Sequence, residues 1–184
     1  MEFITKKKVR NRYFAPESSE IPFFTHMLEK QILNRKKNGE SLLLLCIGTD
    51  KITGDCLGPL VGSKLIKSSF PFPVYGTLQS PVHAGNLYET LSLIRKNHSH
   101  PFILVIDAAV GPSSHIGLVS LSDSSLFPGK GIHRPLFPVG NISVTGIISE
   151  AASCCEETLP FTSLYLVDTI ADFIAEGILA LPFP

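Results

Sequence analysis

Two aspartates, Asp55 and Asp107, are the strongest candidates for catalytic residues in this chain. The apolar run 42–47 is followed by a polar, glycine-containing turn that reaches Asp55, and the apolar run 101–106 leads directly to Asp107. Two carboxyl groups that lie close together cannot both ionise cheaply, so one of them keeps a proton. Such a pair can activate water while protonating an oxygen or a leaving amine. The sequence therefore indicates hydrolytic acid–base chemistry.

A structural role for both aspartates is the alternative. Asp55 could cap the helix that follows it, and Asp107 could accept hydrogen bonds from loop N–H groups. Chain position alone does not separate the two interpretations, because an aspartate at the end of a strand is common.

Other residues near the predicted turn offer weaker chemistry. Cys56, at the start of the next helix, could pair with His83 as a thiol nucleophile, although a small packing role is the commoner one for such a cysteine. Thr145 could orient a backbone group near the site, or could serve as a structural cap. The side chains that could line the site are Asp50, Thr53, Gly54, Cys56, His83 and Thr145.

Nucleotide and metal sites are less well supported. The glycines at 48, 54 and 58 match neither G-x-G-x-x-G nor the P-loop pattern, so they favour tight turns and close packing. Asp55, Asp107 and His83 would make a thin ligand set for a divalent ion. The other histidines show no ligand spacing (His98, His100, His115 and His133). We expect no metal and no other cofactor.

Composition indicates one globular domain. The chain has 184 residues, of which 44% are hydrophobic, enough for a single good core. Its net charge is zero, but the first 37 residues carry nine Lys/Arg and four Asp/Glu, hence +5, and the remainder carries seven and twelve, hence −5. A basic N-terminal arm could contact an acidic partner or nucleic acid, but no basic stripe with regularly interleaved aromatic residues accompanies it, so we expect a solvated arm and no nucleic-acid partner.

Cysteine usage and hydropathy bear on the compartment. The four cysteines (Cys46, Cys56, Cys154 and Cys155) show neither C-x-x-C spacing nor the density of a disulfide scaffold. The basic start lacks the apolar core of a signal peptide, and no apolar run approaches the roughly 18 residues of a membrane span. These features predict a cytoplasmic protein without a membrane partner.

Strands alternating with helices predict an α/β fold with a mainly parallel, doubly wound sheet and helices on both faces. We interpret residues 1–17 as a flexible basic arm and 18–184 as one domain. The expected strands are 42–47, 74–78, 102–106, 116–121 and 161–167, and the expected helices are 19–37, 57–69, a helix starting at 86, 142–153 and 169–181. Residues 127–141 hold three prolines and three glycines, which indicates a long irregular loop. A loop of that length inside a compact domain more often has a function than serves only as a connection.

Several motifs, in order, carry a resemblance to known proteins. Residues 47–62 (IGTDKITGDCLGPLVG) resemble the opening motif of the germination (spore) protease superfamily, whose fold is shared with hydrogenase maturation proteases. More narrowly, the chain is similar to the YyaC family of sporulation proteins. That match also includes 81–84 (PVHA), 105–111 (VIDAAVG), 128–132 (PGKGI) and 138–146 (PVGNISVTG), and it covers roughly residues 41–170.

The resemblance implies a three-layer α/β fold and a function. The catalytic carboxylates of germination protease match Asp55 and Asp107 here, which implies a sporulation-associated endopeptidase acting on a protein or peptide in the cytoplasm of the sporulating cell or forespore. The histidine that completes the nickel-sensing site of the maturation proteases has no clear match, although His83 lies in a plausible loop. A catalytically inactive protein that keeps the fold for binding or scaffolding is the alternative. Assembly into a homo-oligomer is left open.

Overall fold

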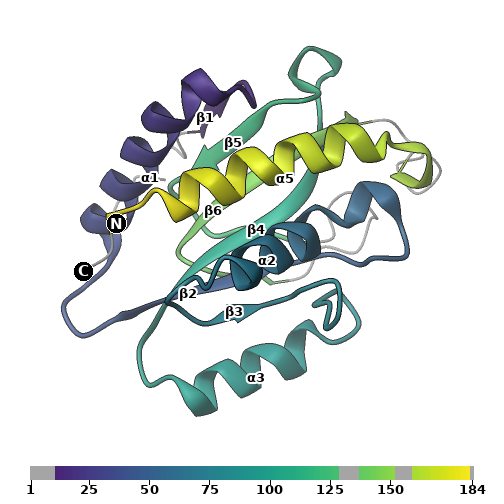
Figure 1. Ribbon diagram of the computed structural model, residues 1–184. Coiled ribbons are helices and arrows are strands. Elements are labelled where there is room, and N and C mark those ends of the chain that lie inside the picture. The colour runs from purple at the N-terminus through teal and green to yellow at the C-terminus, as the bar shows by residue number, and fades with distance from the viewer. Residues whose placement is uncertain (1–10, 129–136, 152–158, 183–184) are drawn as a thin grey trace, which may run out of the picture.

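A computed structural model describes residues 11–128, 137–151 and 159–182 of the chain (Figure 1). Within them the helices are α1 (Ile21–Arg35), α2 (Leu57–Lys67), α3 (Leu87–Asn97) and α5 (Leu164–Leu179). The strands are β1 (Asn11–Phe14), β2 (Ser41–Cys46), β3 (Val74–Tyr75), β4 (Pro101–Gly111), β5 (Val119–Ser122) and β6 (Ile142–Glu150). Short 3₁₀ turns are η1 (Ser18–Glu20), η2 (Thr53–Asp55), η3 (Ser113–His115) and η5 (Leu159–Phe161).

The described strands form one six-stranded sheet in the order β1-β5-β6-β4-β2-β3. Pairing is parallel from β3 through β2 and β4 to β6, whereas β5 runs antiparallel to both β6 and β1. The sheet is therefore mixed. The α/β class that the sequence predicts is confirmed.

Strands β2 and β4 are adjacent and parallel, as their uninterrupted apolar sequences predict. They pair in register from Ser41 opposite Pro101 to Cys46 opposite Ile106, and neither lies at an edge of the sheet. Nearly every side chain in the paired segments is buried. Parallel strands that are covered on both faces need apolar residues at successive positions, which explains the pattern.

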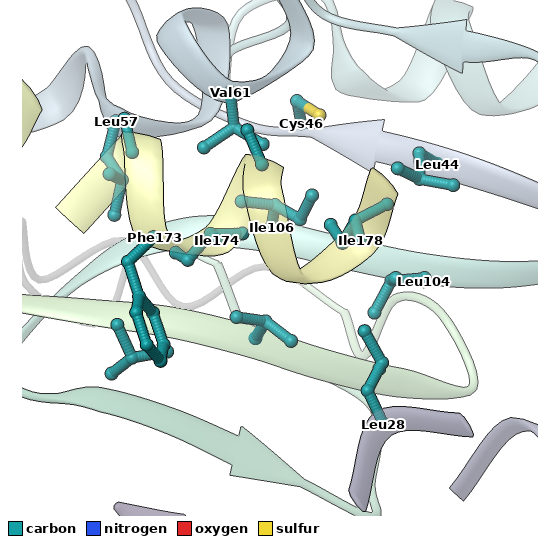
Figure 2. Close-up of a cluster of buried hydrophobic side chains, with 14 of the residues drawn as sticks. Leu28, Leu44, Cys46, Leu57, Val61, Leu104, Ile106, Phe173, Ile174 and Ile178 are labelled. Carbon is teal, nitrogen blue, oxygen red and sulfur yellow. The ribbon is translucent and has the colours of Figure 1, made fainter. Parts of the chain in front are cut away.

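The two faces of the sheet contribute to separate hydrophobic clusters. Alternate side chains of β2 (Leu42, Leu44 and Cys46) join the larger cluster with α1, α2 and α5, whereas Leu43, Leu45 and Ile47 join a smaller one with α3. Figure 2 shows part of the larger cluster, in which Ile174 and Ile178 of α5 and Val61 of α2 lie over Leu104 and Ile106 of β4. Because strand side chains alternate in direction, β2 anchors both clusters.

Two predicted elements are wrong in type. Residues 142–153 were expected to be helical, but Ile142–Glu150 is the strand β6, since its β-branched residues suit a pleated sheet and β4 offers a partner along its length. Residues 161–167 were expected to be a strand, but η5 and the start of α5 occupy them. There the Ser163 side chain accepts a hydrogen bond from the Leu166 N–H and caps α5.

Other boundaries shift by a few residues. β1 belongs to the predicted arm 1–17, so the end of that arm pairs with β5 in the sheet. The second predicted strand, 74–78, shortens to Val74–Tyr75, and β4 continues past Asp107 to Gly111. Helix α5 starts at Leu164 rather than at 169. Of the irregular loop 127–141, residues 129–136 lie outside the described part, as do Cys154 and Cys155.

The described helices include none with the length and apolar character needed to cross a bilayer.

The packing of β4 predicts a large stability difference between two leucine truncations. Leu104 is fully buried, whereas Leu33 on α1 is 71% exposed. Leu104→Ala should lower the free energy of unfolding by about 2–5 kcal/mol because it leaves a cavity between β4 and the helices. Leu33→Ala removes the same atoms from an exposed position and should change it by less than about 0.5 kcal/mol. Urea unfolding followed by circular dichroism measures both, and equal losses would contradict this core assignment.

Candidate active site

A cavity of about 280 Å³ opens where β2 and β4 end. Asp55, His83 and Asp107 supply its polar groups, and Ile52, Val110 and Leu159 are among the apolar residues of its wall. In open α/β sheets ligands bind beyond the carboxyl ends of the strands, so the position is one where chemistry is expected. The structure therefore brings the two aspartates of the sequence analysis into one cavity.

Asp107 lies within β4, one residue beyond the segment that pairs with β2, and its strand partner is Thr145 of β6. Its side chain is 8% exposed, and one carboxyl oxygen, Oδ1, accepts a hydrogen bond of 2.8 Å from the Ala108 N–H. Burial raises the pKa of Asp107 well above its usual value, the nearby charge of Asp55 raises it further, and the Ala108 N–H lowers it. The neutral acid is therefore the favoured form of Asp107.

Asp55 closes the turn that follows β2. Its backbone N–H donates to the Ile52 carbonyl at 2.9 Å, and its carbonyl accepts from the Thr49 N–H at 2.9 Å. Burial raises the pKa of Asp55 to about 6, and a hydrogen bond from the Thr49 backbone opposes that rise. With a pKa of about 6, Asp55 is therefore mostly ionised at neutral pH, whereas burial shifts Asp107 toward its protonated form.

Glycine at position 48 permits this turn. Gly48 has a φ of 141°, and a Cβ there would lie 2.0 Å from the Asp55 carbonyl oxygen. The Gly48 N–H also donates to the Val82 carbonyl at 2.7 Å. No other residue tolerates both the dihedral and the contact, so the turn can fold back against β2 only with glycine there.

The alternative that both aspartates have only a structural role is supported in part for Asp107 and not for Asp55. Cys56, not Asp55, is the N-cap residue of α2, and no side chain makes a capping hydrogen bond there. Asp107 does accept a loop-side N–H, from Ala108. Neither arrangement offsets the free-energy cost of placing two carboxyl groups in one cavity, one buried and one half-buried.

His83 is held in a defined orientation at the cavity wall. Its Nδ1 accepts a hydrogen bond of 3.1 Å from the Gly85 N–H, and its own backbone N–H donates to the Asn86 side-chain oxygen at 2.8 Å. With Nδ1 occupied as an acceptor, the neutral imidazole carries its proton on Nε2. His83 is thus prepared to donate a hydrogen bond rather than to accept a proton at Nε2.

Cys56 belongs to the core rather than to the cavity. The residue is 6% exposed, and its thiol donates to the Thr53 carbonyl at 3.0 Å. Burial raises the pKa of Cys56, with smaller contributions from nearby carboxylates. A thiol that is hard to ionise is a poor nucleophile, and His83 lies on the cavity wall while Cys56 does not.

The remaining predicted site residues do not line the cavity. Three of them belong to the turn, and Thr145 lies in β6. Asp50 is exposed at the tip of the turn, and Thr53 is half-buried at the start of η2. Gly54 is buried, and a Cβ there would lie 2.8 Å from the Leu159 carbonyl oxygen. Thr145 pairs with Asp107 across β6 and β4, so its side chain projects from the same face of the sheet.

Apolar wall residues are what the sequence analysis missed. Phe127 and Pro128 lie at the start of the predicted irregular loop, whose proline and glycine content was the available signal, and Leu126 directly precedes it. Leu159 approaches from η5, far away in the chain. No local pattern marks Leu159 as a site residue, because only the docking of η5 against η2 brings it there.

The described residues form no cluster of metal ligands. No group of three or more His, Cys, Asp or Glu side chains in that part of the chain is arranged to hold an ion. Asp55, Asp107 and His83 share the cavity without forming such a cluster.

Comparisons with known proteins place the chain among relatives without an assigned function. A family model described as "Protein of unknown function (DUF1256)" matches residues 13–177. The chain is also 40% identical over 145 residues to "Uncharacterized protein YyaC" of Bacillus subtilis (strain 168), an alignment covering 78% of this chain and 71% of the relative.

Replacing Asp107 by asparagine should stabilise the protein at neutral and alkaline pH, because the folded protein then no longer has to bind a proton at this position or bury a charge. A carboxyl group whose pKa is higher in the folded than in the unfolded protein binds its proton more tightly in the folded state. Its proton-linked contribution to the free energy of unfolding is therefore greatest below the unfolded-state pKa of about 3.8 and is lost as pH rises. Asp107→Asn keeps the Ala108 hydrogen bond and has no proton to lose.

We expect Asp107→Asn to raise Tm at pH 8 by at least about 2–4 °C and to raise it much less at pH 4. In a domain of this size, a Tm change of about 2–4 °C corresponds to about 1 kcal/mol in the free energy of unfolding. Circular dichroism melts at both pH values measure the difference. Asp50→Asn, which changes an exposed carboxyl of the same turn, is the control and should leave Tm nearly unchanged. A lower Tm for Asp107→Asn at pH 8 would show that burial of the charge is not what limits stability.

Proposed function

This chain belongs to the DUF1256 family, and we propose that it is a peptide-bond hydrolase in which Asp55 and Asp107 share the catalytic work. The observation that supports the proposal is the pair of carboxyl groups in one cavity, Asp107 buried and Asp55 half-buried, where burial raises the pKa of Asp55 to about 6 and the pKa of Asp107 well above its usual value. Groups whose environments separate their protonation states are suited to act as base and acid at the same pH.

The protonation states assign the two roles. Ionised Asp55 takes a proton from a water molecule, whose oxygen attacks the scissile carbonyl carbon while protonated Asp107 donates its proton to the carbonyl oxygen. The tetrahedral intermediate then collapses. Asp55 returns its proton to the departing amine nitrogen, the C–N bond breaks, and Asp107 recovers a proton from the hydroxyl group that becomes the new carbonyl. The net reaction consumes one water and releases an acid and an amine.

His83 fits a supporting role in this scheme. Its Nε2–H, left free by the Nδ1 hydrogen bond, would donate to a peptide carbonyl beside the scissile bond. The apolar wall excludes bulk water, which strengthens each of these polar interactions. His83 would therefore position the substrate without exchanging a proton.

The choice of a peptide bond and of a biological setting rests on the sequence resemblance. We propose that the fold is the three-layer arrangement of the hydrogenase maturation proteases, supported by α1, α2 and α5 packing against one face of the sheet and α3 against the other. The resemblance to germination protease and to the YyaC family supports a sporulation-associated endopeptidase in the cytoplasm of the sporulating cell. Its substrate would be a protein or peptide.

A binding or scaffolding role is the second candidate. The cavity wall is largely apolar and two carboxyl groups could serve as ligand-binding groups, so the same cavity could retain a peptide without cleaving it. The two candidates differ in whether products are released.

Isosteric replacement of either aspartate tests the proposal. Asp55→Asn and Asp107→Asn keep the shape of the side chain and remove its acid–base function, so each should lower the rate of cleavage about 10²–10⁴-fold. Purified protein is incubated with extracts of sporulating cells, and new peptide termini are identified by mass spectrometry.

Two matched variants control for indirect effects. Asp50→Asn changes a carboxyl of the same turn that does not line the cavity, and Cys56→Ala removes the thiol, so both should retain activity. Cleavage that persists in both Asp55→Asn and Asp107→Asn would refute the dyad, and its loss in Cys56→Ala would indicate a thiol mechanism. Retention of a partner without cleavage would favour the scaffold.

The pH dependence of the rate should report the two carboxyl groups. We expect kcat/KM to rise between pH 5 and pH 7 with a midpoint near the Asp55 pKa of about 6, because Asp55 must be ionised. At higher pH the rate should fall again as Asp107 loses the proton it donates. A rate on a cleaved peptide that is flat from pH 5 to pH 7 would contradict the assignment of Asp55 as base.

A further inference from the structure

A second cavity, of about 560 Å³, lies between the β3 edge of the sheet and α3. Its polar groups come from Thr77, Ser80, Asn86 and Thr90, and Leu93 contributes an apolar side chain from α3. None of its lining residues, all of which are in the described part of the chain, carries a formal charge, histidine apart. Its volume falls within the roughly 300–1,000 Å³ that is usual for ligand sites.

His83 joins this cavity to the one that holds the aspartates. It lines both of them, and the short segment that carries it lies against the end of β2, where Val82 pairs with Ile47. Asn86 fixes that segment, because its side-chain oxygen accepts the His83 N–H and its amide donates to the Pro81 carbonyl at 3.0 Å. A ligand in the second cavity therefore reaches the aspartates by passing a rigid His83.

The edge of the sheet beside the second cavity is open. β3 is the last strand on that side of the described sheet, and it pairs only with β2. The Pro73 carbonyl points toward β2, since it accepts the Leu44 N–H at 2.9 Å. Backbone groups of successive strand residues alternate in direction, so those of Val74 point outward. An extended peptide can pair with such an edge while its side chains enter the cavity beside it.

We propose that the second cavity is the subsite for an extended, uncharged segment of the substrate on one side of the scissile bond, paired with the β3 edge. This inference rests on the proposed peptidase function. The open edge recognises any extended backbone, and the uncharged wall selects among side chains, because a Lys, Arg, Asp or Glu placed there would lose hydration without gaining a partner. The segment then continues past His83 to place its scissile bond at Asp55 and Asp107.

A matched pair of substitutions on α3 tests the subsite. Thr90 and Ser92 each donate a side-chain hydroxyl to the carbonyl four residues earlier, at 3.0 Å and 2.9 Å, but only Thr90 lines the second cavity. Thr90→Arg introduces a long charged side chain there, and Ser92→Arg introduces it at an exposed position of the same helix.

The first measurement is a cleavage profile on a library of proteome-derived peptides. With wild type we expect charged residues to be depleted on one side of the cleaved bond. Thr90→Arg should lower cleavage at least tenfold or shift the preference on that side toward acidic residues, and Ser92→Arg should match wild type. An unchanged rate and profile for Thr90→Arg would overturn the subsite while leaving the dyad intact.

The second measurement does not depend on turnover. Immobilised Asp107→Asn protein is incubated with the same library, and retained peptides are quantified, alone and combined with Thr90→Arg or Ser92→Arg. We expect at least tenfold lower retention with Thr90→Arg only. Such a loss without any cleavage by wild type would uphold the subsite and refute the peptidase. No retention, or equal retention by all three proteins, would overturn the subsite.

A second variant keeps the test possible if Thr90→Arg does not fold. Leu93 also lines the second cavity and is 49% exposed, so Leu93→Arg disturbs the core of α3 less than a buried substitution would. If Thr90→Arg fails to fold by circular dichroism, Leu93→Arg takes its place with the same expected losses.

Discussion

The placement of two carboxyl groups in one cavity beside the parallel strands β2 and β4, with Asp107 buried and Asp55 half-buried, is the constraint around which this structure is built. A carboxylate that leaves water loses hydration free energy, and the cost rises when a like charge lies nearby. Burial raises the pKa of Asp107 and so favours its uncharged form, and a hydrogen bond from the Thr49 backbone stabilises the charged form of Asp55. The rest of the fold must supply enough packing free energy to hold both groups there.

That free energy comes from the clusters on the two faces of β2 and β4. Helix α2 begins two residues after Asp55, so the packing that fixes α2 also fixes the Asp55 turn. Helix α5 packs across α2, and Lys64 of α2 pairs with Asp168 and Asp172 of α5 at 2.9 Å and 2.6 Å. These exposed ion pairs add little stability by themselves. Their contribution is to fix the relative position of the two helices.

The same sheet edge that positions the acids also organises the approach to them. The 81–86 segment extends the sheet beyond β2 through the Ile47–Val82 bridge, and the Asn86 side chain holds it by accepting the His83 N–H and donating to the Pro81 carbonyl. The proposed catalytic groups and the proposed substrate subsite therefore lie in two neighbouring cavities. The cavity with the two aspartates is on one side of His83, and the uncharged cavity beside the open β3 edge is on the other.

The sequence by itself determined the elements whose signals are local: the apolar runs of β2 and β4, the 3.6-residue periodicity of α1 and α3, and the turn after β2 that carries Asp55. It placed Asp107 at the end of its strand, but β4 continues to Gly111. It misassigned 142–153 and 161–167, because β-branched and apolar runs of that length suit a strand or a buried helix equally, and only the available partners decide.

Tertiary structure alone decided what surrounds the aspartates. Parallel pairing of β2 with β4 placed both in one cavity, docking of η5 against η2 brought Leu159 to its wall, and burial set the protonation state of each acid. These outcomes depend on contacts between residues far apart in the chain, and no local pattern of residue types encodes the desolvation that such contacts produce.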